Sequence, residues 1–165
     1  MQKFHSKSEQ ETENIAAEFA VSLKSGDVVA LFGDLGAGKT AFTRGISAAL
    51  GADTNIVSSP TFALLNEYDG DLKIHHFDLY RLENAPLCEL DWLDEYLFGD
   101  GVTLIEWADY ILPLLPENHI RVEIERLSEH EREIRISPNG HARNLRNAGS
   151  ANPRDGLHND RREYI

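Results

Sequence analysis

A glycine-rich stretch between an apolar run and a helical pattern carries the clearest chemistry in this sequence. A glycine, four residues and then Gly38-Lys39-Thr40 match every fixed position of the phosphate-binding P-loop, or Walker A, pattern. Glycines let backbone amides converge on phosphate oxygens, and the helix that follows adds free N–H groups and its dipole. Lys39 is expected to contact the β- and γ-phosphates and Thr40 to contact Mg²⁺. The residues predicted to bind ATP are Gly33, Asp34, Leu35, Gly36, Ala37, Gly38, Lys39 and Thr40.

The spacing of these glycines excludes two other nucleotide-binding classes. It does not fit the G-x-G-x-x-G pattern of dinucleotide-binding folds or of protein kinases, and the kinase His-Arg-Asp and Asp-Phe-Gly signatures are absent from the sequence.

Two carboxylates end predicted strands and are candidates for the rest of the site. Glu106 ends the run 102–105, which places it at the carboxyl edge of a sheet, where open α/β folds bind ligands. It is either a magnesium ligand or a glutamate that merely ends a strand. Asp78 ends the run from Leu72, and it either orients water, holds a magnesium-bound water or begins a turn.

Three further positions have both a functional and a structural interpretation, and a pair of histidines lies beside them. Thr61 lies where a loop could sense the γ-phosphate, or it belongs to an ordinary loop. Arg81 is an arginine finger or part of a surface ion pair, and Trp107 stacks on a base or fills the core. His75 and His76 alternate faces in a strand, so at most one of them points toward the site.

The surrounding pattern predicts a single α/β domain with a mixed sheet flanked by helices. Helices are expected over 8–25, where Ser8 and Glu11 form a capping box, over 39–50, and from Pro86 to Gly99. Strands are expected over 28–32, 62–68, 72–78, 102–105, 120–124 and 134–136.

Composition bounds the class of protein. The chain has 165 residues, 41% of them hydrophobic, and its longest apolar runs are far too short to span a membrane. The polar first residues lack the apolar core of a signal peptide, and Cys88 is the single cysteine. A cytoplasmic protein without membrane attachment is therefore expected.

Charge is distributed unevenly along the chain. The net charge is −12, which argues against a protein that grips DNA or RNA over its whole surface. Residues 1–137 hold 11 Lys and Arg against 25 Asp and Glu, and residues 138–165 hold five Arg against three acids. We predict an ATPase domain over 1–137 and a polar, disordered tail over 138–165.

Four segments in this order closely resemble the bacterial TsaE family, also called YjeE. They are the P-loop 33–40, Ser59-Pro60-Thr61-Phe62, His76-Phe77-Asp78-Leu79-Tyr80-Arg81-Leu82 and Leu104-Ile105-Glu106-Trp107. The resemblance covers roughly residues 8–137. It implies a P-loop α/β domain with a mixed sheet, and an ATPase that is weak alone and works with the transferase subunits TsaD and TsaB. The implied process is threonylcarbamoylation of the adenosine beside the tRNA anticodon, with tRNA reached indirectly through the complex.

The resemblance also implies roles for individual residues. Lys39 and Thr40 bind phosphate and magnesium, Glu106 is the acidic magnesium ligand, Asp78 is needed for hydrolysis and Thr61 lies in a switch-like loop. The predicted catalytic residues are thus Lys39, Asp78 and Glu106.

Two other functions compete with this one. A small-molecule phosphotransferase would use the same P-loop, but such kinases usually carry an arginine-rich lid, and only Arg44 and Arg81 occur between Lys39 and Ile120. A nucleotide-gated interaction module would bind ATP to order a loop, with incidental hydrolysis.

Overall fold

Three fully buried strands form the centre of the sheet, and two of them are the apolar runs seen in the sequence. Every residue of β2 (Val28–Phe32), β4 (Ile74–Asp78) and β5 (Val102–Glu106) is buried. β5 lies between the other two and runs parallel to both, so the three carboxyl ends meet at one edge of the sheet. Parallel strands buried on both faces are typically continuous apolar runs, which explains why the sequence revealed β2 and β5. β4 differs, because His75, His76 and Asp78 are polar residues buried within it.

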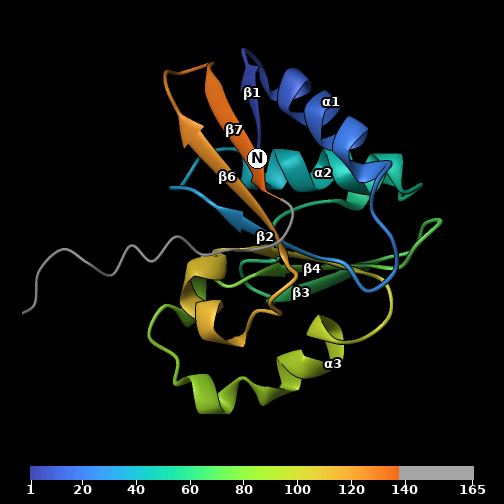
Figure 1. The fold of residues 1–165 in the computed structure, drawn as a ribbon, viewed down its shortest axis with the longest axis vertical. Coiled ribbons are helices and arrows are strands. Elements are labelled where there is room, and N and C mark those ends of the chain that lie inside the picture. The colour runs from blue at the N-terminus through green and yellow to red at the C-terminus, as the bar shows by residue number, and fades with distance from the viewer. Residues whose placement is uncertain (138–165) are drawn as a thin grey trace, which may run out of the picture.

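The computed structural model describes residues 1–137, which form one seven-stranded mixed sheet in the order β1-β7-β6-β2-β5-β4-β3 (Figure 1). β6 is parallel to β2, whereas β1 with β7, β6 with β7 and β3 with β4 are antiparallel pairs. The outer strands are β1 (Gln2–Ser6), β3 (Leu65–Tyr68), β6 (Ile120–Arg126) and β7 (Arg132–Ser137).

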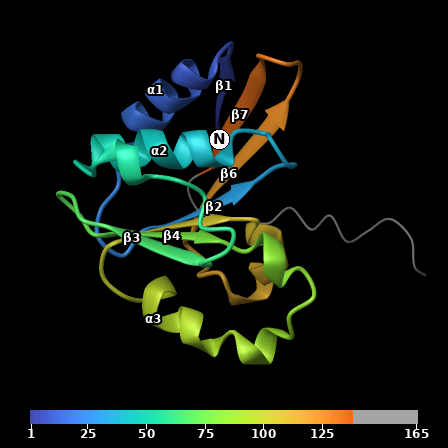
Figure 2. The same ribbon diagram turned by 180° about the vertical axis from the view of Figure 1, so that it is seen from behind.

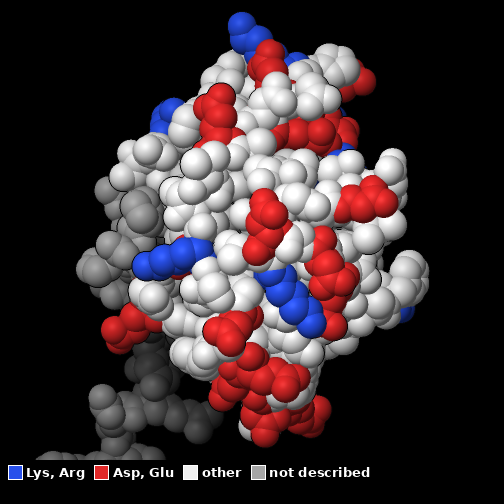
Figure 3. Space-filling model, turned by 90° about the vertical axis from the view of Figure 1, so that its right-hand side faces the viewer, with Lys and Arg blue, Asp and Glu red and all other residues white. Residues whose placement is uncertain are grey.

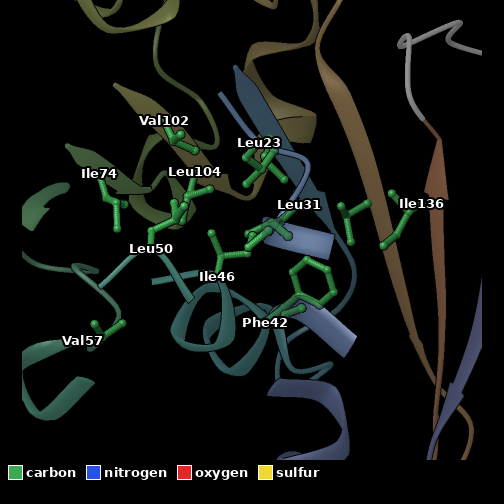
Figure 4. Packing of buried hydrophobic residues seen from close by; sticks show 14 of the residues in the cluster. Leu23, Leu31, Phe42, Ile46, Leu50, Val57, Ile74, Val102, Leu104 and Ile136 are labelled. Carbon is green, nitrogen blue, oxygen red and sulfur yellow. The ribbon is translucent and has the colours of Figure 1, made fainter. Parts of the chain in front are cut away.

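Helices cover both faces of this sheet, and the predicted α/β class is confirmed. α1 (Glu9–Ala20) and α2 (Lys39–Ala49) pack together on one face, and α3 (Asp94–Leu97) lies with short 3₁₀ turns on the other (Figures 1 and 2). Phe42 and Ile46 of α2 lie beside Leu31 of β2 in the core under the first face (Figure 4). The 3₁₀ segments are Thr54–Ile56, Tyr80–Leu82, Leu87–Glu89, Asp91–Leu93 and Ala108–Leu114.

The first helix confirms its predicted start and corrects its predicted end. The Ser8 hydroxyl accepts a hydrogen bond from the Glu11 amide at 3.1 Å, and the Glu11 carboxylate accepts one from the Lys7 amide at 2.7 Å. The helix ends at Ala20 and not at Ser25. The Ser22 hydroxyl donates a hydrogen bond to the Phe19 carbonyl oxygen at 2.8 Å, and a turn begins there instead.

Three further segments differ from the expectations. The predicted helix after Pro86 is a series of 3₁₀ turns before the short α3, because the backbone at Leu90 leaves the helical region with φ −109°. The strand expected from Phe62 begins only at Leu65, after a turn. β1 was not expected, since Phe4 is the single apolar residue among its five.

The tail predicted over 138–165 lies outside the described residues, and the domain boundary at 137 stays a prediction. Within residues 1–137, no helix is long and apolar enough to cross a bilayer.

Candidate nucleotide-binding site

The P-loop links the end of β2 to the first turn of α2, and its glycines have conformations that other residues rarely adopt. Gly33, Gly36 and Gly38 have φ of +146°, +75° and +112°. A Cβ on Gly33 would lie 2.3 Å from the carbonyl oxygen of Ile124, so the loop can pass β6 only with a glycine there. Gly38 caps α2 without a side-chain hydrogen bond, which leaves backbone N–H groups of the first turn available to an anion.

Lys39 is buried and folds back onto the loop that carries it. Its ammonium donates to the carbonyl oxygens of Gly33 at 2.5 Å and Asp34 at 2.9 Å, and it lies 3.8 Å from the centre of a Trp107 ring. Burial lowers the pKa of Lys39, against the opposing effect of nearby carboxylates, of which Glu106 is the strongest. No carboxylate touches the ammonium within the described chain, so an arriving phosphate would meet a partly desolvated cation held by neutral carbonyls.

Thr40 and Glu106 are brought together as the sequence suggests. The Thr40 hydroxyl lies 2.9 Å and 3.1 Å from the two carboxylate oxygens of Glu106. Glu106 is 3% exposed, and His76 Nε2 lies 2.9 Å from the same Oε1 atom. The result is a hydroxyl and a carboxylate side by side at the first turn of α2. Such hard oxygen ligands suit Mg²⁺.

Asp78 lies next to Glu106, because the two residues are register partners on β4 and β5. One Asp78 oxygen accepts from the hydroxyls of Thr61, at 2.8 Å, and Ser59. The other oxygen accepts from the Tyr80 amide at 3.0 Å. Asp78 thus fixes the start of the turn after β4 and also holds the loop that contains Thr61.

These groups line one cavity of about 480 Å³. Its walls come from the P-loop and α2, from Ser59 and Thr61, from Asp78 and Glu106, and from Thr12 of α1. The volume lies in the range of small-molecule sites. A glycine cradle, a buried lysine, the free start of a helix and a hydroxyl–carboxylate pair together fit a magnesium-bound nucleoside triphosphate.

Comparisons with known proteins agree with this geometry. The family model for the threonylcarbamoyl adenosine biosynthesis protein TsaE matches residues 6–134. The chain belongs to the TsaE family. It is 45% identical over 139 residues to the tRNA threonylcarbamoyladenosine biosynthesis protein TsaE of Bacillus subtilis, covering 84% of this chain and 86% of that protein. The TsaE of Treponema pallidum is 37% identical over 80% of this chain and 97% of its own length.

A solved structure shares the fold of this TsaE family member. The crystal structure of Bacillus subtilis YdiB superposes with a TM-score of 0.69 at 39% identity, covering 84% of this chain and 86% of that one. The family model spans residues 6–134, and all the residues that line the cavity lie within that range. The match to this nucleotide-binding family therefore includes the cavity.

Of the two residues with open interpretations, Trp107 lines the cavity in this TsaE family member, and Arg81 does not. Trp107 is half-buried; its ring lies under the Lys39 ammonium and packs at 6.0 Å on Tyr110. It therefore both packs on the core and lines the cavity. Arg81 lies 4.8 Å from the Phe62 ring, and within residues 1–137 it forms no ion pair.

Sequence reasoning missed contributions from both ends of the chain. Arg132, at the start of β7, donates from Nε to the Ala37 carbonyl at 2.9 Å and so supports the P-loop from outside. Thr12 of α1 lines the same side of the cavity. Neither residue has a local signal, because each reaches the site only through the sheet and the packing of α1 on α2. Tyr68, on the other side, contacts His76 at 3.2 Å.

Proposed function

We propose that this protein binds ATP with Mg²⁺ in the cavity and hydrolyses it as the ATPase subunit of tRNA threonylcarbamoyladenosine biosynthesis. The observation that carries this proposal is the meeting of three groups at one cavity: the P-loop with Lys39, the Thr40–Glu106 pair and Asp78. Family membership connects that cavity to the tRNA modification for which the relatives are named.

Phosphate binding would use the backbone amides of the P-loop together with Lys39. On binding, the ammonium would exchange its two carbonyl partners for phosphate oxygens, which offer it a full negative charge. The glycines Gly36 and Gly38 and residues Asp34, Leu35 and Ala37 would supply the surrounding backbone.

Thr40 and Glu106 would hold Mg²⁺, since both present oxygen atoms at the same point. When bound, Mg²⁺ would neutralise the charge that develops on the phosphates during hydrolysis. Asp78 is the register partner of Glu106 at the cavity and would orient the attacking water. For this role Asp78 must release Ser59 or Thr61, whose hydroxyls would then be available to the γ-phosphate or the metal.

The proposed partners, TsaD and TsaB, are inferred from membership of the TsaE family. We propose that the ATPase is weak alone and is stimulated by the TsaD–TsaB transferase pair, which contacts tRNA. The charge of this chain fits contact with a protein better than a direct grip on RNA. Figure 3 shows acidic side chains gathered on one face toward the end of the molecule that carries α3 in Figure 1. The sequence holds no Lys or Arg between Arg81 and Arg121, so a partner with a basic surface would fit there.

The decisive experiment measures ATP hydrolysis with and without purified TsaD and TsaB, for the wild type, Lys39→Ala and the matched control Lys24→Ala. We expect slow hydrolysis alone, clear stimulation by the pair, loss of activity in Lys39→Ala and no change at the exposed Lys24.

A cellular experiment complements this assay. Cells that lack the protein should lose the modified adenosine, and only the wild type should restore it. Full modification in those cells would contradict the assignment. Restoration by Asp78→Ala would instead favour a nucleotide-gated module in which hydrolysis is incidental.

A further inference from the structure

A line of buried side chains leads from the magnesium-binding pair to the loop over the cavity. Glu106 contacts His76 Nε2 at 2.9 Å, and His76 Nδ1 lies 3.2 Å from the Tyr68 hydroxyl. The Tyr68 hydroxyl lies 3.3 Å from the carbonyl oxygen of Ser58, next to Ser59. His76 is 0% exposed and Tyr68 is 3% exposed, so the part of this line from Glu106 to Tyr68 is shielded from solvent.

The chemistry of these groups assigns the protons along the line. A carboxylate of Glu106 only accepts hydrogen bonds, so His76 Nε2 carries a proton and donates it. With a neutral imidazole ring, His76 Nδ1 is the acceptor and the Tyr68 hydroxyl is the donor that reaches it. The hydroxyl has one proton and two acceptors within reach, His76 and the Ser58 carbonyl.

Asn66 also donates to the second acceptor, the carbonyl oxygen of Ser58. Its Nδ2 donates to the Ser58 carbonyl at 3.2 Å and to the Tyr68 oxygen at 3.3 Å. While Tyr68 donates to His76, Asn66 holds the carbonyl of Ser58. If His76 moved with Glu106, the Tyr68 proton could turn to Ser58 instead, and the loop would be held differently.

We propose that His76 and Tyr68 are positioning residues that couple Glu106 and Thr40 to residues 57–64, which carry Ser59 and Thr61. This inference rests on the proposed function, because it assigns a control element to the same nucleotide site. A change at Glu106 on nucleotide binding passes through His76 and Tyr68 to the loop whose hydroxyls occupy Asp78.

The surroundings argue against a purely structural role for this pair. Ile74 and Leu104, which flank His76 along and across the strands, are apolar core residues, and an apolar side chain would suit the same position. Burying a histidine and a tyrosine hydroxyl is unfavourable unless both are hydrogen-bonded, and such networks fix one arrangement of their members. His75, which points to the other face, offers a contrast: its ring meets Tyr96 with centroids 5.0 Å apart, far from the cavity groups.

Three variants separate the steps of this coupling. Tyr68→Phe removes only the hydroxyl. His76→Gln keeps an amide donor near Glu106 and loses the acceptor for Tyr68. His76→Leu loses both contacts. The matched control is Tyr96→Phe, because Tyr96 is also packed against a histidine of β4 but on the opposite face.

Chymotryptic cleavage after Phe62 reports on the loop directly, because Phe62 is 86% exposed. In the wild type and in Tyr96→Phe, Mg-ATP should change the cleavage rate at Phe62. In Tyr68→Phe and His76→Gln this change should disappear, while calorimetry finds unchanged ATP affinity. Tyr68→Phe is nearly isosteric, so the test stands even if His76→Leu fails to fold.

Steady-state kinetics provide the second measurement. For Tyr68→Phe we expect kcat to fall by about 10-fold with unchanged KM, the lower end of the usual effect of residues that orient metal ligands. Tyr68→Phe with a wild-type response at Phe62 and a wild-type kcat would overturn the coupling and leave the ATPase assignment intact. A wild type that neither binds nor hydrolyses ATP would overturn both.

Discussion

The two faces of the central strands bury different kinds of side chain. Toward α2, β4 and β5 present His76, Asp78 and Glu106. Asp78 and Glu106 line the cavity, and His76 contacts Glu106 from beneath it. Toward α3, the same strands present Phe77 and Ile105 to an apolar cluster. Because successive side chains of a strand point to opposite faces, the polar cavity residues lie on one face of the sheet and the apolar packing residues lie on the other.

Neighbouring residues of β4 therefore have different roles, one in packing and the next in the cavity. Phe77 packs against Trp92 and Tyr96, with ring centroids 6.0 Å and 5.1 Å apart, and has no contact with the cavity groups. Its neighbour Asp78 has only polar partners. Substitutions at adjacent positions should therefore affect different properties, stability on one face and hydrolysis on the other.

The largest expected effect is on the packing face. Phe77→Ala should lower the free energy of unfolding by about 3–5 kcal/mol, because it leaves a cavity under the aromatic cluster. Urea denaturation followed by circular dichroism measures this change. ATP affinity of the molecules that remain folded should be unchanged; weaker binding at equal folded concentration would contradict the separation of the faces.

The next effect is on the chemical face. Asp78→Asn keeps the size of the side chain and removes its charge, so kcat for ATP hydrolysis should fall by about 100-fold, because the carboxylate that orients the attacking water is lost. Calorimetry should show Mg-ATP binding within a few-fold of the wild type. The exposed Asp91 provides the control Asp91→Asn. Equal loss of binding and hydrolysis would show that Asp78 holds the nucleotide instead.

Lys39→Met should reduce affinity for Mg-ATP by about 100-fold, because a charge-assisted contact with phosphate is lost. Its stability should behave in the opposite way to that of Phe77→Ala: without nucleotide the variant should unfold at an equal or higher urea concentration, since a buried cation is replaced by an apolar side chain. A clear loss of stability would show that the carbonyl contacts of Lys39 support the fold.

The smallest expected effect is the pH dependence of stability from Lys39. Burial lowers its pKa in the folded protein below 10.5. Between the lowered pKa and 10.5 the unfolded chain therefore binds more protons, and this group makes the free energy of unfolding rise with pH. The difference between wild type and Lys39→Met in urea midpoints should shrink as pH increases through that range. A constant difference would mean that Lys39 titrates normally.

The sequence predicts the site better than it predicts the edges of the fold. The P-loop, the capping box of α1 and the buried runs of β2, β4 and β5 are local signals, and each follows from residues within a few positions of one another. Glu106 and Asp78 were placed at strand ends by the same logic, and the structure shows them as neighbours in the register.

Long-range pairing has no such signal. β1 was missed because its partner is β7, at the opposite end of the described chain. The stripe of Leu90, Leu93 and Leu97 correctly marked buried positions. It predicted a continuous helix, however, because side chains three residues apart share a face in a 3₁₀ turn as well.

The pairing of β1 with β7 has a consequence for how the protein is made. The first strand pairs with residues 132–136, so it cannot be incorporated into the sheet until that late segment has emerged from the ribosome. The same segment supplies Arg132, which supports the P-loop at Ala37. During synthesis the glycine loop is therefore complete long before its outer support, and the nascent chain acquires a finished nucleotide site only after residues 132–136 have been made.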